Sequence, residues 1–368
     1  MSSKNTSLLD SQLREAAAYD PFLRGRFPVG VQTFEAHDEA RDRRFPCEVW
    51  YPAAAEQAAQ DVDPRIQDCF TPRLGNTEQR QSAVRDAATH AGTYPLILFS
   101  HHSGGHRRTS TFLCTHLSSH GYIVAALDHS EVMAPELAHP QNETEEQKDL
   151  RWQAVIESRV PDARFLIDQM LDSGAWNNNA EIDHDQVGLV GHSFGGATAL
   201  ATPECDERIK AVVALAPGGA SNPRPGILPV KLTWQWGRAV PALFLAAEND
   251  VPLPLAGMYE LFERAPEPKQ LVILRRADHM HFVDDAEQAH EAFRTMSPVP
   301  PEVAEMQREM IPFAQLCSGE RAHLWIRGLT LAHMDAFLKD QREAKQLLAG
   351  DIEGELAKRG VEVMVHRP

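Results

Sequence analysis

The sequence lacks the features of a membrane or secreted protein. It contains no apolar window that approaches the length of a membrane span. Residues 1–7 carry no basic region followed by an apolar stretch, so no secretory signal is expected. Internal repeats and low-complexity tracts are absent as well. We therefore expect a cytoplasmic protein without a membrane-spanning segment.

Cysteines are few, and basic residues are outnumbered by acidic ones. The five cysteines are odd in number and widely scattered, which indicates reduced, buried or half-buried thiols rather than a disulfide framework. Lysine and arginine together number 36 against 52 aspartates and glutamates, a formal net charge of -16. Such an excess of negative charge argues against nucleic acid and anionic membrane surfaces as partners. The cysteines are Cys47, Cys69, Cys114, Cys205 and Cys317.

What the chain does contain is enough apolar sequence for a large core. Hydrophobic residues make up 43% of its 368 residues, and short apolar runs alternate with segments of helical pattern. This alternation predicts an α/β fold with a mainly parallel central sheet covered by helices on both faces. Strands are expected near residues 46–51, 95–100, 122–127, 186–191, 210–216, 241–247 and 270–275.

The chain is expected to form one domain with short additions at both ends. That domain spans residues 27–345, between an N-terminal extension (1–26) and a C-terminal tail (346–368). Near its end, residues 284–320 contain two amphipathic segments separated by prolines, which predict a helical insertion. These helices serve either as a lid or as plain scaffold. In the tail, residues 361–365 predict a strand at a sheet edge of this or another subunit.

A proline divides the helical pattern in the middle of the chain. Residues 142–148 are acidic and predict a solvated loop, followed by a helix at 150–156. Pro161 then predicts the start of a second helix, because proline is favoured in the first turn.

The most informative motif is a serine between glycines. Residues 191–196 read Gly-His-Ser-Phe-Gly-Gly, with an apolar strand-like run before them and a helix-forming run after them. This pattern is typical of a nucleophile elbow, in which a strand enters a helix through a turn so tight that small residues must flank the serine. Ser193 is therefore the candidate nucleophile. Its hydroxyl needs a histidine base and a carboxylate that orients this base.

Two later strand ends offer the acid and the base. The run at 241–247 ends in Glu248-Asn249-Asp250, and we assign the acid to Asp250, with Glu248 as the alternative. The next apolar run leads into a loop with two histidines. We assign the base to His279, which lies nearer the strand end, and keep His281 as the alternative. The two would face opposite ways in an extended segment, so only one can reach the serine.

An oxyanion hole requires two backbone N–H groups near the nucleophile. The first is predicted to be that of Phe194, which follows the serine. The second should come from the glycine-rich loop after the strand at 95–100, and we assign it to Ser103, with His102 second. The histidines of this loop match no zinc spacing, so neither a metal nor another cofactor is expected.

Other residues are candidates for contact with the substrate. The segment 221–237 connects two predicted strands at the edge of the sheet where ligands bind. Its tryptophans, Trp234 and Trp236, either line an apolar substrate wall or belong to the core. His102 is a further candidate, because it lies in the predicted oxyanion loop.

These pieces resemble a known family. The stretches FSHHSGGHRRTSTFLCTHLSSHGYIVAALDH (99–129), GHSFGGATAL (191–200) and DHMHFVDD (278–285) look like the platelet-activating-factor acetylhydrolase and dienelactone-hydrolase-like branch of the α/β-hydrolases. The opening at 27–53 is similar to the first strands of that branch. The resemblance implies an α/β-hydrolase fold, in which Ser193 is the nucleophile and the first histidine of the H-x-x-F-x-D stretch is the base.

The chain departs from that pattern at two places, the position of the acid and the oxyanion loop. The acetylhydrolases carry their acid at the end of the strand after the elbow, where this chain has Pro217 and Gly218. The sequence Glu-Asn-Asp at 248–250 instead resembles the acid loop of cutinase-like polyester hydrolases. The tryptophan usual in those polyesterases is absent near Ala216, and His102 replaces the usual glycine of the oxyanion loop.

Together the motifs predict a serine carboxylic-ester hydrolase. Its substrate would be a small-molecule ester with a short acyl chain, cleaved through an acyl-enzyme intermediate. Three alternatives use the same sequence differently. They are acyl transfer or polyester hydrolysis with the same machinery, a hydrolase-fold protein that only binds a small molecule, and a metal-dependent hydrolase.

Overall fold

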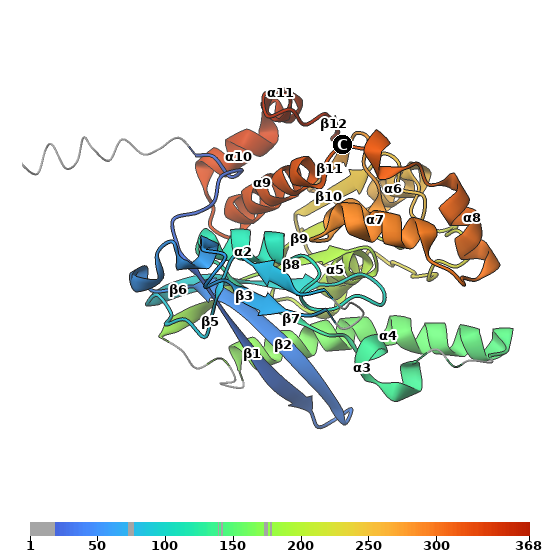
Figure 1. Ribbon diagram of the computed structural model, residues 1–368, viewed down its shortest axis with the longest axis horizontal. Coiled ribbons are helices and arrows are strands. Elements are labelled where there is room, and N and C mark those ends of the chain that lie inside the picture. Colours follow the sequence, from blue (N-terminus) through green and yellow to red (C-terminus); the bar gives the residue numbers. More distant parts are fainter. Residues whose placement is uncertain (1–18, 73–76, 139, 141–142, 173–175, 177–178) are drawn as a thin grey trace, which may run out of the picture.

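The fold is built on one long mixed sheet (Figure 1). The computed structural model describes residues 19–72, 77–138, 140, 143–172, 176 and 179–368. In these ranges ten strands pair in the order β12-β11-β10-β9-β8-β6-β7-β2-β1-β5. Their bounds are β1 (Val29–Asp38), β2 (Arg43–Pro52), β5 (Val84–Arg85), β6 (Gly92–Ser100), β7 (Ile123–Leu127), β8 (Ala180–His192), β9 (Ile209–Leu215), β10 (Ala242–Ala247), β11 (Lys269–Leu274) and β12 (Val363–His366). A separate pair joins β3 (Asp68–Phe70) to β4 (Gln79–Gln81).

The central strands are parallel, and antiparallel strands flank them. Neighbours from β7 through β6, β8, β9 and β10 to β11 run parallel, whereas β2 pairs antiparallel with β7 and β12 pairs antiparallel with β11. The parallel strands are near-continuous apolar runs because both of their faces are covered. All seven predicted strands are present, and the predicted α/β class with a mainly parallel sheet is confirmed.

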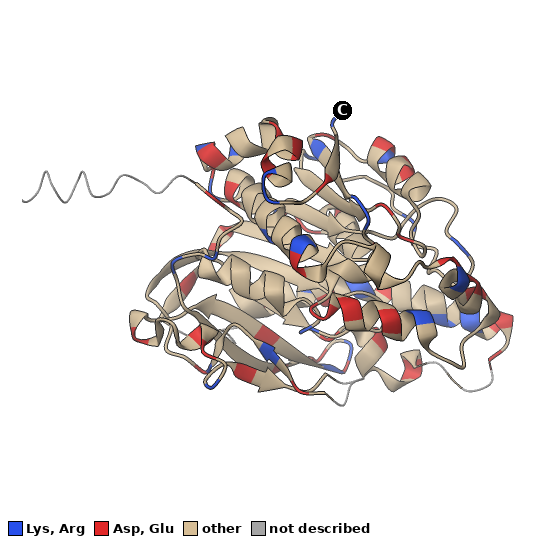
Figure 2. Ribbon diagram, turned by 45° about the horizontal axis from the view of Figure 1, so that its top comes forward, with Lys and Arg blue, Asp and Glu red and all other residues tan. Residues whose placement is uncertain are grey.

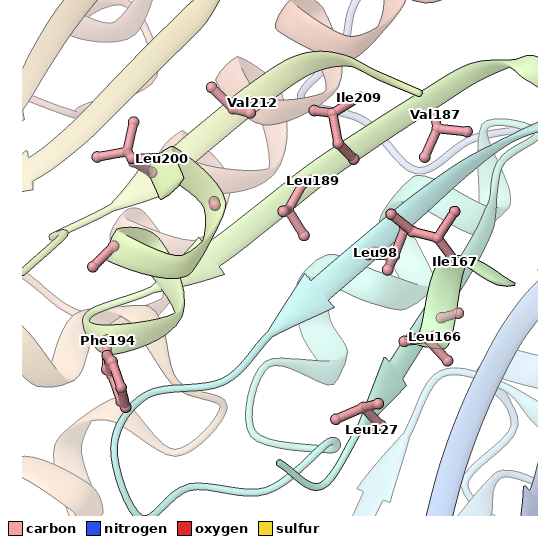
Figure 3. Close-up of a cluster of buried hydrophobic side chains, with 14 of the residues drawn as sticks. Leu98, Leu127, Leu166, Ile167, Val187, Leu189, Phe194, Leu200, Ile209 and Val212 are labelled. Carbon is pink, nitrogen blue, oxygen red and sulfur yellow. The ribbon is translucent and has the colours of Figure 1, made fainter. Parts of the chain in front are cut away.

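Helices cover both faces of the sheet. On one face, α4 (Glu145–Leu171), α5 (Phe194–Cys205) and α6 (Leu255–Arg264) bury apolar side chains against it, and Figure 3 shows part of this layer. On the other face lie α2 (Thr111–Ser119), α9 (Gly319–Phe337), α10 (Arg342–Ala349) and α11 (Ile352–Ala357). Successive side chains of a strand point to opposite faces of the sheet. In β6, Leu96 and Leu98 therefore pack in the first layer, and Ile97 and Phe99 pack in the second. The remaining short elements are α3 (Ser130–Met133), α7 (Ala286–Thr295), α8 (Pro301–Glu309), η1 (Ala55–Gln57), η2 (Gln60–Val62), η3 (Pro135–Leu137), η4 (His279–Phe282) and η5 (Phe313–Gln315).

One helix is longer than the sequence predicted. The two helices expected on either side of Pro161 are a single helix, α4, which begins inside the segment predicted as a solvated loop. An interior proline costs a helix about 3 kcal/mol, so other contacts must hold both halves in line. Just before it, Arg159 pairs with Glu131 on α3, and just after it, Asp162 accepts hydrogen bonds from the N–H and hydroxyl of Ser130, both at 2.8 Å. These buried contacts, which link distant segments, explain why the predicted break is wrong.

The insertion and the tail are both folded onto the domain. The two helices predicted within 284–320 are α7 and α8. In the tail, β12 pairs with β11 at one edge of the central sheet. Of the two predicted pairings, the one within the same chain is therefore found. Along the ribbon in Figure 2, positions of both charge signs are interspersed over many elements.

The cysteines follow the prediction in part. Among the described residues all five are free, and Cys47, Cys114 and Cys317 are buried. Cys69 and Cys205 are instead exposed, because Cys69 points outward from the small sheet and Cys205 ends α5. Within the described ranges, no helix combines the length and the apolar character needed to cross a bilayer.

Candidate active site

The predicted elbow is present and is visibly strained. Ser193 lies between β8 and α5 with φ 58° and ψ −113°, a backbone conformation that L-residues rarely adopt. A Cβ on Gly191 would lie 2.0 Å from the carbonyl oxygen of Gly195, and a Cβ on Gly195 would lie 1.9 Å from that of Ser100. The flanking glycines are therefore required by close backbone approach, which holds the serine at the N-terminus of α5.

The predicted acid and base are hydrogen-bonded to each other. Asp250 follows β10, and His279 begins η4 just after β11, the neighbouring parallel strand. The Nδ1 of His279 lies 2.7 Å from Oδ2 of Asp250, whose Oδ1 accepts the N–H of Leu253 at 2.8 Å. Burial alone would lower the pKa of His279, but the charge and hydrogen bond of Asp250 outweigh it and raise the pKa. The pair thus favours an imidazole that readily takes up a proton.

A small cavity of about 100 Å³ brings the candidate residues together. Ser193 and His279 both line it, and so do Phe194 and Ser103, whose N–H groups are the predicted oxyanion donors. Neither N–H has a hydrogen-bond acceptor among the described residues. The remaining walls are mostly aliphatic, and they consist of Gly218, Gly226, Ile227, Leu228, Val230, Pro252 and Leu253.

The tryptophans are not part of this cavity. Trp236 is buried in the core, where its indole N–H donates to the carbonyl of Leu200 at 3.0 Å. Trp234 packs partly buried against the same core, with the guanidinium of Arg264 over its ring. The expectation of a tryptophan-lined substrate wall is therefore wrong for this pocket. Proximity in the chain pointed to the correct segment, but Gly226, Ile227, Leu228 and Val230 of that segment line the cavity instead.

His102 lies beside the site without lining the cavity. Its ring packs edge-on against that of His192 at 5.4 Å between centroids, and burial lowers its pKa to about 4. It therefore stays neutral near pH 7. Ser103, the first choice for the second oxyanion donor, lines the cavity of Ser193, whereas His102 is not among the residues that line it.

The alternative acid and base point elsewhere. Glu248 pairs with Arg275 at 3.1 Å and accepts the N–H of Arg276 at 2.9 Å. His281 is fully buried, with Nδ1 2.8 Å from Asp278 and Nε2 donating to the carbonyl of Cys317 at 3.0 Å. Both residues therefore act in the scaffold around the site.

Asp278 joins two histidines, one in its own loop and one on α7. It binds His281, and its second oxygen binds Nδ1 of His290 on α7, whose Nε2 donates to the carbonyl of Ile311 at 3.0 Å. The ring of Phe313 stacks on His281 at 4.9 Å between centroids. This cluster connects the loop that carries His279, the candidate base, to the helical insertion.

The His281–Asp278 pair predicts a pH-dependent stability. Burial opposes a charged imidazole, but the hydrogen bond to Asp278 outweighs it and raises the pKa of His281 to about 10. A raised pKa in the folded state contributes stability that is complete below the unfolded value of about 6.5 and is lost as the pH rises through about 10. Urea unfolding between pH 6 and about 10.5 is expected to show this decline, and His281→Asn to flatten it. An equal slope in the variant would contradict the assignment.

The insertion supports the cavity from behind. Helix α8 packs on the loop that lines the pocket: a Cβ on Gly226 would lie 2.8 Å from the side chain of Glu302. Arg224, in the same loop, pairs with Glu309 at 2.6 Å. These contacts place the insertion next to the loop that lines the cavity, and its role as a lid stays a prediction.

A second Ser-His-Asp arrangement, which the sequence did not reveal, lies deeper. Ser100 Oγ is 2.8 Å from Nε2 of His129, whose Nδ1 is 3.2 Å from Asp162. Each of the three is at most 2% exposed, so no substrate carbonyl can reach this serine. Ser193 differs because it opens on a cavity. Among the described residues, no group of three or more His, Cys, Asp or Glu side chains is arranged to hold a metal ion.

Comparison with known proteins identifies the class. A solved ferulic acid esterase from Streptomyces cinnamoneus superposes with a TM-score of 0.60 at 24% identity, covering 88% of this chain and 94% of that one. This likeness, together with the sheet order and the elbow of this chain, shows an α/β-hydrolase fold, as the sequence predicted.

The sequence similarity is to ester hydrolases within that class. A family model described as chlorophyllase matches residues 75–235, a span that includes Ser103 and Ser193. The platelet-activating factor acetylhydrolase of Cavia porcellus is 27% identical over 227 residues, 52% of this chain and 48% of that protein. That of Bos taurus is 28% identical over 161 residues, 33% of this chain and 34% of its own. The chain thus matches about half the length of these relatives or less.

Proposed function

We propose that this protein is a serine carboxylic-ester hydrolase acting on small esters with short acyl chains. The observation that carries the proposal is the 2.7 Å His279–Asp250 hydrogen bond at a cavity shared with a serine in a strained elbow. The relatives and the structural neighbour support it, because their names are those of ester hydrolases.

The mechanism follows from these positions. His279, oriented by Asp250, takes the proton of Ser193 as its hydroxyl attacks the ester carbonyl. The developing oxyanion accepts hydrogen bonds from the N–H groups of Phe194 and Ser103. The protonated imidazole then donates to the leaving alcohol, and an acyl-enzyme forms. Water, activated by the same histidine, releases the acid.

The cavity favours a short acyl chain. Its volume of about 100 Å³ is far below the roughly 300–1,000 Å³ of pockets for drug-sized ligands. The walls near the serine are aliphatic, with Ile227, Leu228 and Leu253 among them, so they suit a small apolar group and offer no charged partner. Acyl chains beyond a few carbons would have to displace these walls.

Two measurements test the proposal together. A fluorophosphonate probe should label the wild-type protein once, and mass spectrometry should map the adduct to Ser193. Rates on p-nitrophenyl esters should be highest for acetate to butyrate and fall by at least about tenfold for octanoate, since each misplaced methylene changes binding by about 1–3 kcal/mol. Absence of both labelling and turnover would leave a hydrolase-fold binding protein as the better explanation.

A further inference from the structure

A buried arginine lies directly under both predicted oxyanion donors. Arg159 on α4 is 1% exposed and reaches the loop after β6 as well as the first turn of α5. Its Nη1 donates to the carbonyl of His101 at 2.7 Å, and its Nη2 donates to that of His102 at 3.3 Å. Its guanidinium carbon lies 4.1 Å from the centre of the Phe194 ring. One side chain therefore contacts both segments of the predicted hole.

We propose that Arg159 is a positioning residue that aims the N–H groups of Ser103 and Phe194 at the oxyanion. The proposal rests on the ester-hydrolase function proposed above. In a trans peptide the carbonyl and the following N–H point in opposite directions. Holding the His102 carbonyl toward Arg159 therefore turns the Ser103 N–H away from the arginine, and Ser103 lines the cavity of Ser193.

The neighbouring groups fix the same peptide. Nδ1 of His101 donates to the His102 carbonyl at 2.6 Å, and its Nε2 accepts the N–H of His129 at 3.1 Å. Burial, with the charge of Arg159 next, lowers the pKa of His101 well below its usual value, so the ring is neutral and can donate only through Nδ1. A flipped 102–103 peptide would lose both donors to its carbonyl. It would also point an oxygen at the oxyanion.

The contact of Arg159 with the Phe194 ring links the segment of the Phe194 N–H to the loop of the Ser103 N–H. Phe194 is 5% exposed and is the first residue of α5, directly after Ser193, as Figure 3 shows. A guanidinium stacked on an aromatic ring is held in one orientation by cation–π attraction. The pair Glu131–Arg159 neutralises the buried charge, because Nε of Arg159 donates to Glu131 at 2.7 Å and Nη2 binds its other oxygen.

The test compares variants that keep or remove the carbonyl contacts. Arg159→Met with Glu131→Gln removes the guanidinium without leaving Glu131 as an unpaired buried charge. Arg159→Lys keeps one positive donor but loses the planar fork. Glu131→Gln alone removes the counter-charge of Arg159 but keeps an amide oxygen that can accept from the guanidinium, so it controls for the second substitution of the double variant.

The expected result separates transition-state stabilisation from substrate binding. With p-nitrophenyl acetate, the double variant should lose about 10²–10³-fold in kcat, the effect of a lost oxyanion donor, while KM stays within about threefold. Its affinity for a short trifluoromethyl ketone, which forms an anionic adduct with the serine, should fall by a similar factor. Affinity for the matching methyl ketone should hardly change. Arg159→Lys should fall between the double variant and Glu131→Gln.

Folding is checked by circular dichroism and thermal unfolding. If the double variant does not fold, the same kinetic and binding measurements are made on Arg159→Lys. A folded variant without Arg159 that keeps the kcat and the trifluoromethyl-ketone affinity of Glu131→Gln overturns the positioning role alone. The positioning role is also overturned if the variant binds the trifluoromethyl ketone and the methyl ketone more weakly by the same factor. A wild-type protein that hydrolyses no ester overturns the proposed function, and this role with it.

Discussion

Replacing Ser193 with alanine is expected to lower kcat for p-nitrophenyl acetate by about 10⁴-fold or more, with little change in KM. The substitution removes only the hydroxyl of a residue that lines the cavity, so substrate can still enter while no acyl-enzyme forms. Alanine has the same backbone limits as serine at φ 58°, so thermal unfolding should be nearly unchanged. Steady-state kinetics and a burst measurement on the same preparation check both parts.

Ser103→Ala is the matched control, because Ser103 contributes the other serine hydroxyl among the residues that line the described cavity. Its predicted role uses the backbone N–H, which alanine retains, so kcat should fall by less than about tenfold. Equal losses in the two variants, or fluorophosphonate labelling that persists in Ser193→Ala, would contradict the assignment of the nucleophile.

The site was predictable where short-range geometry dictates it. Gly191 and Gly195, which close backbone approaches require, lie within two residues of Ser193. The elbow can therefore be recognised from one continuous segment of sequence. Asp250 and His279 lie where parallel strands end, and the carboxyl ends of neighbouring parallel strands β10 and β11 meet at one edge of the sheet. Residues far apart in the chain could thus be paired by a rule of the fold.

The errors concern contacts that only tertiary packing decides. Pro161 carries a helix-breaking signal, yet Arg159 and Asp162 anchor the two halves of α4 to segments near residues 101 and 130. Trp234 and Trp236 occupy a loop whose position was predicted correctly, but which of its side chains face the serine depends on how the loop packs on α8. No local pattern distinguishes these cases.

Asp250→Asn is expected to lower kcat by about 10⁴-fold and to move the acidic limb of the pH profile. The Asp250 carboxylate raises the pKa of His279 against the opposing effect of burial, and the enzyme needs the neutral imidazole as base. Activity of the wild type should therefore rise with pH through a value above the usual 6.5. Without the carboxylate the midpoint should fall to lower pH, and the residual rate of the variant, followed from pH 4 to 9, measures this shift.

Glu248→Gln provides the control for the acid, since Glu248 belongs to the same loop and has the same charge as Asp250. Its carboxylate binds Arg275 and the N–H of Arg276, away from the histidine, so the variant should keep kcat within about threefold and leave the midpoint in place. If Glu248→Gln abolished activity and Asp250→Asn did not, the acid would have to be reassigned. The 2.7 Å contact would then be a structural pair. Because charge and loop position are shared, only the geometry of that hydrogen bond separates the two expectations.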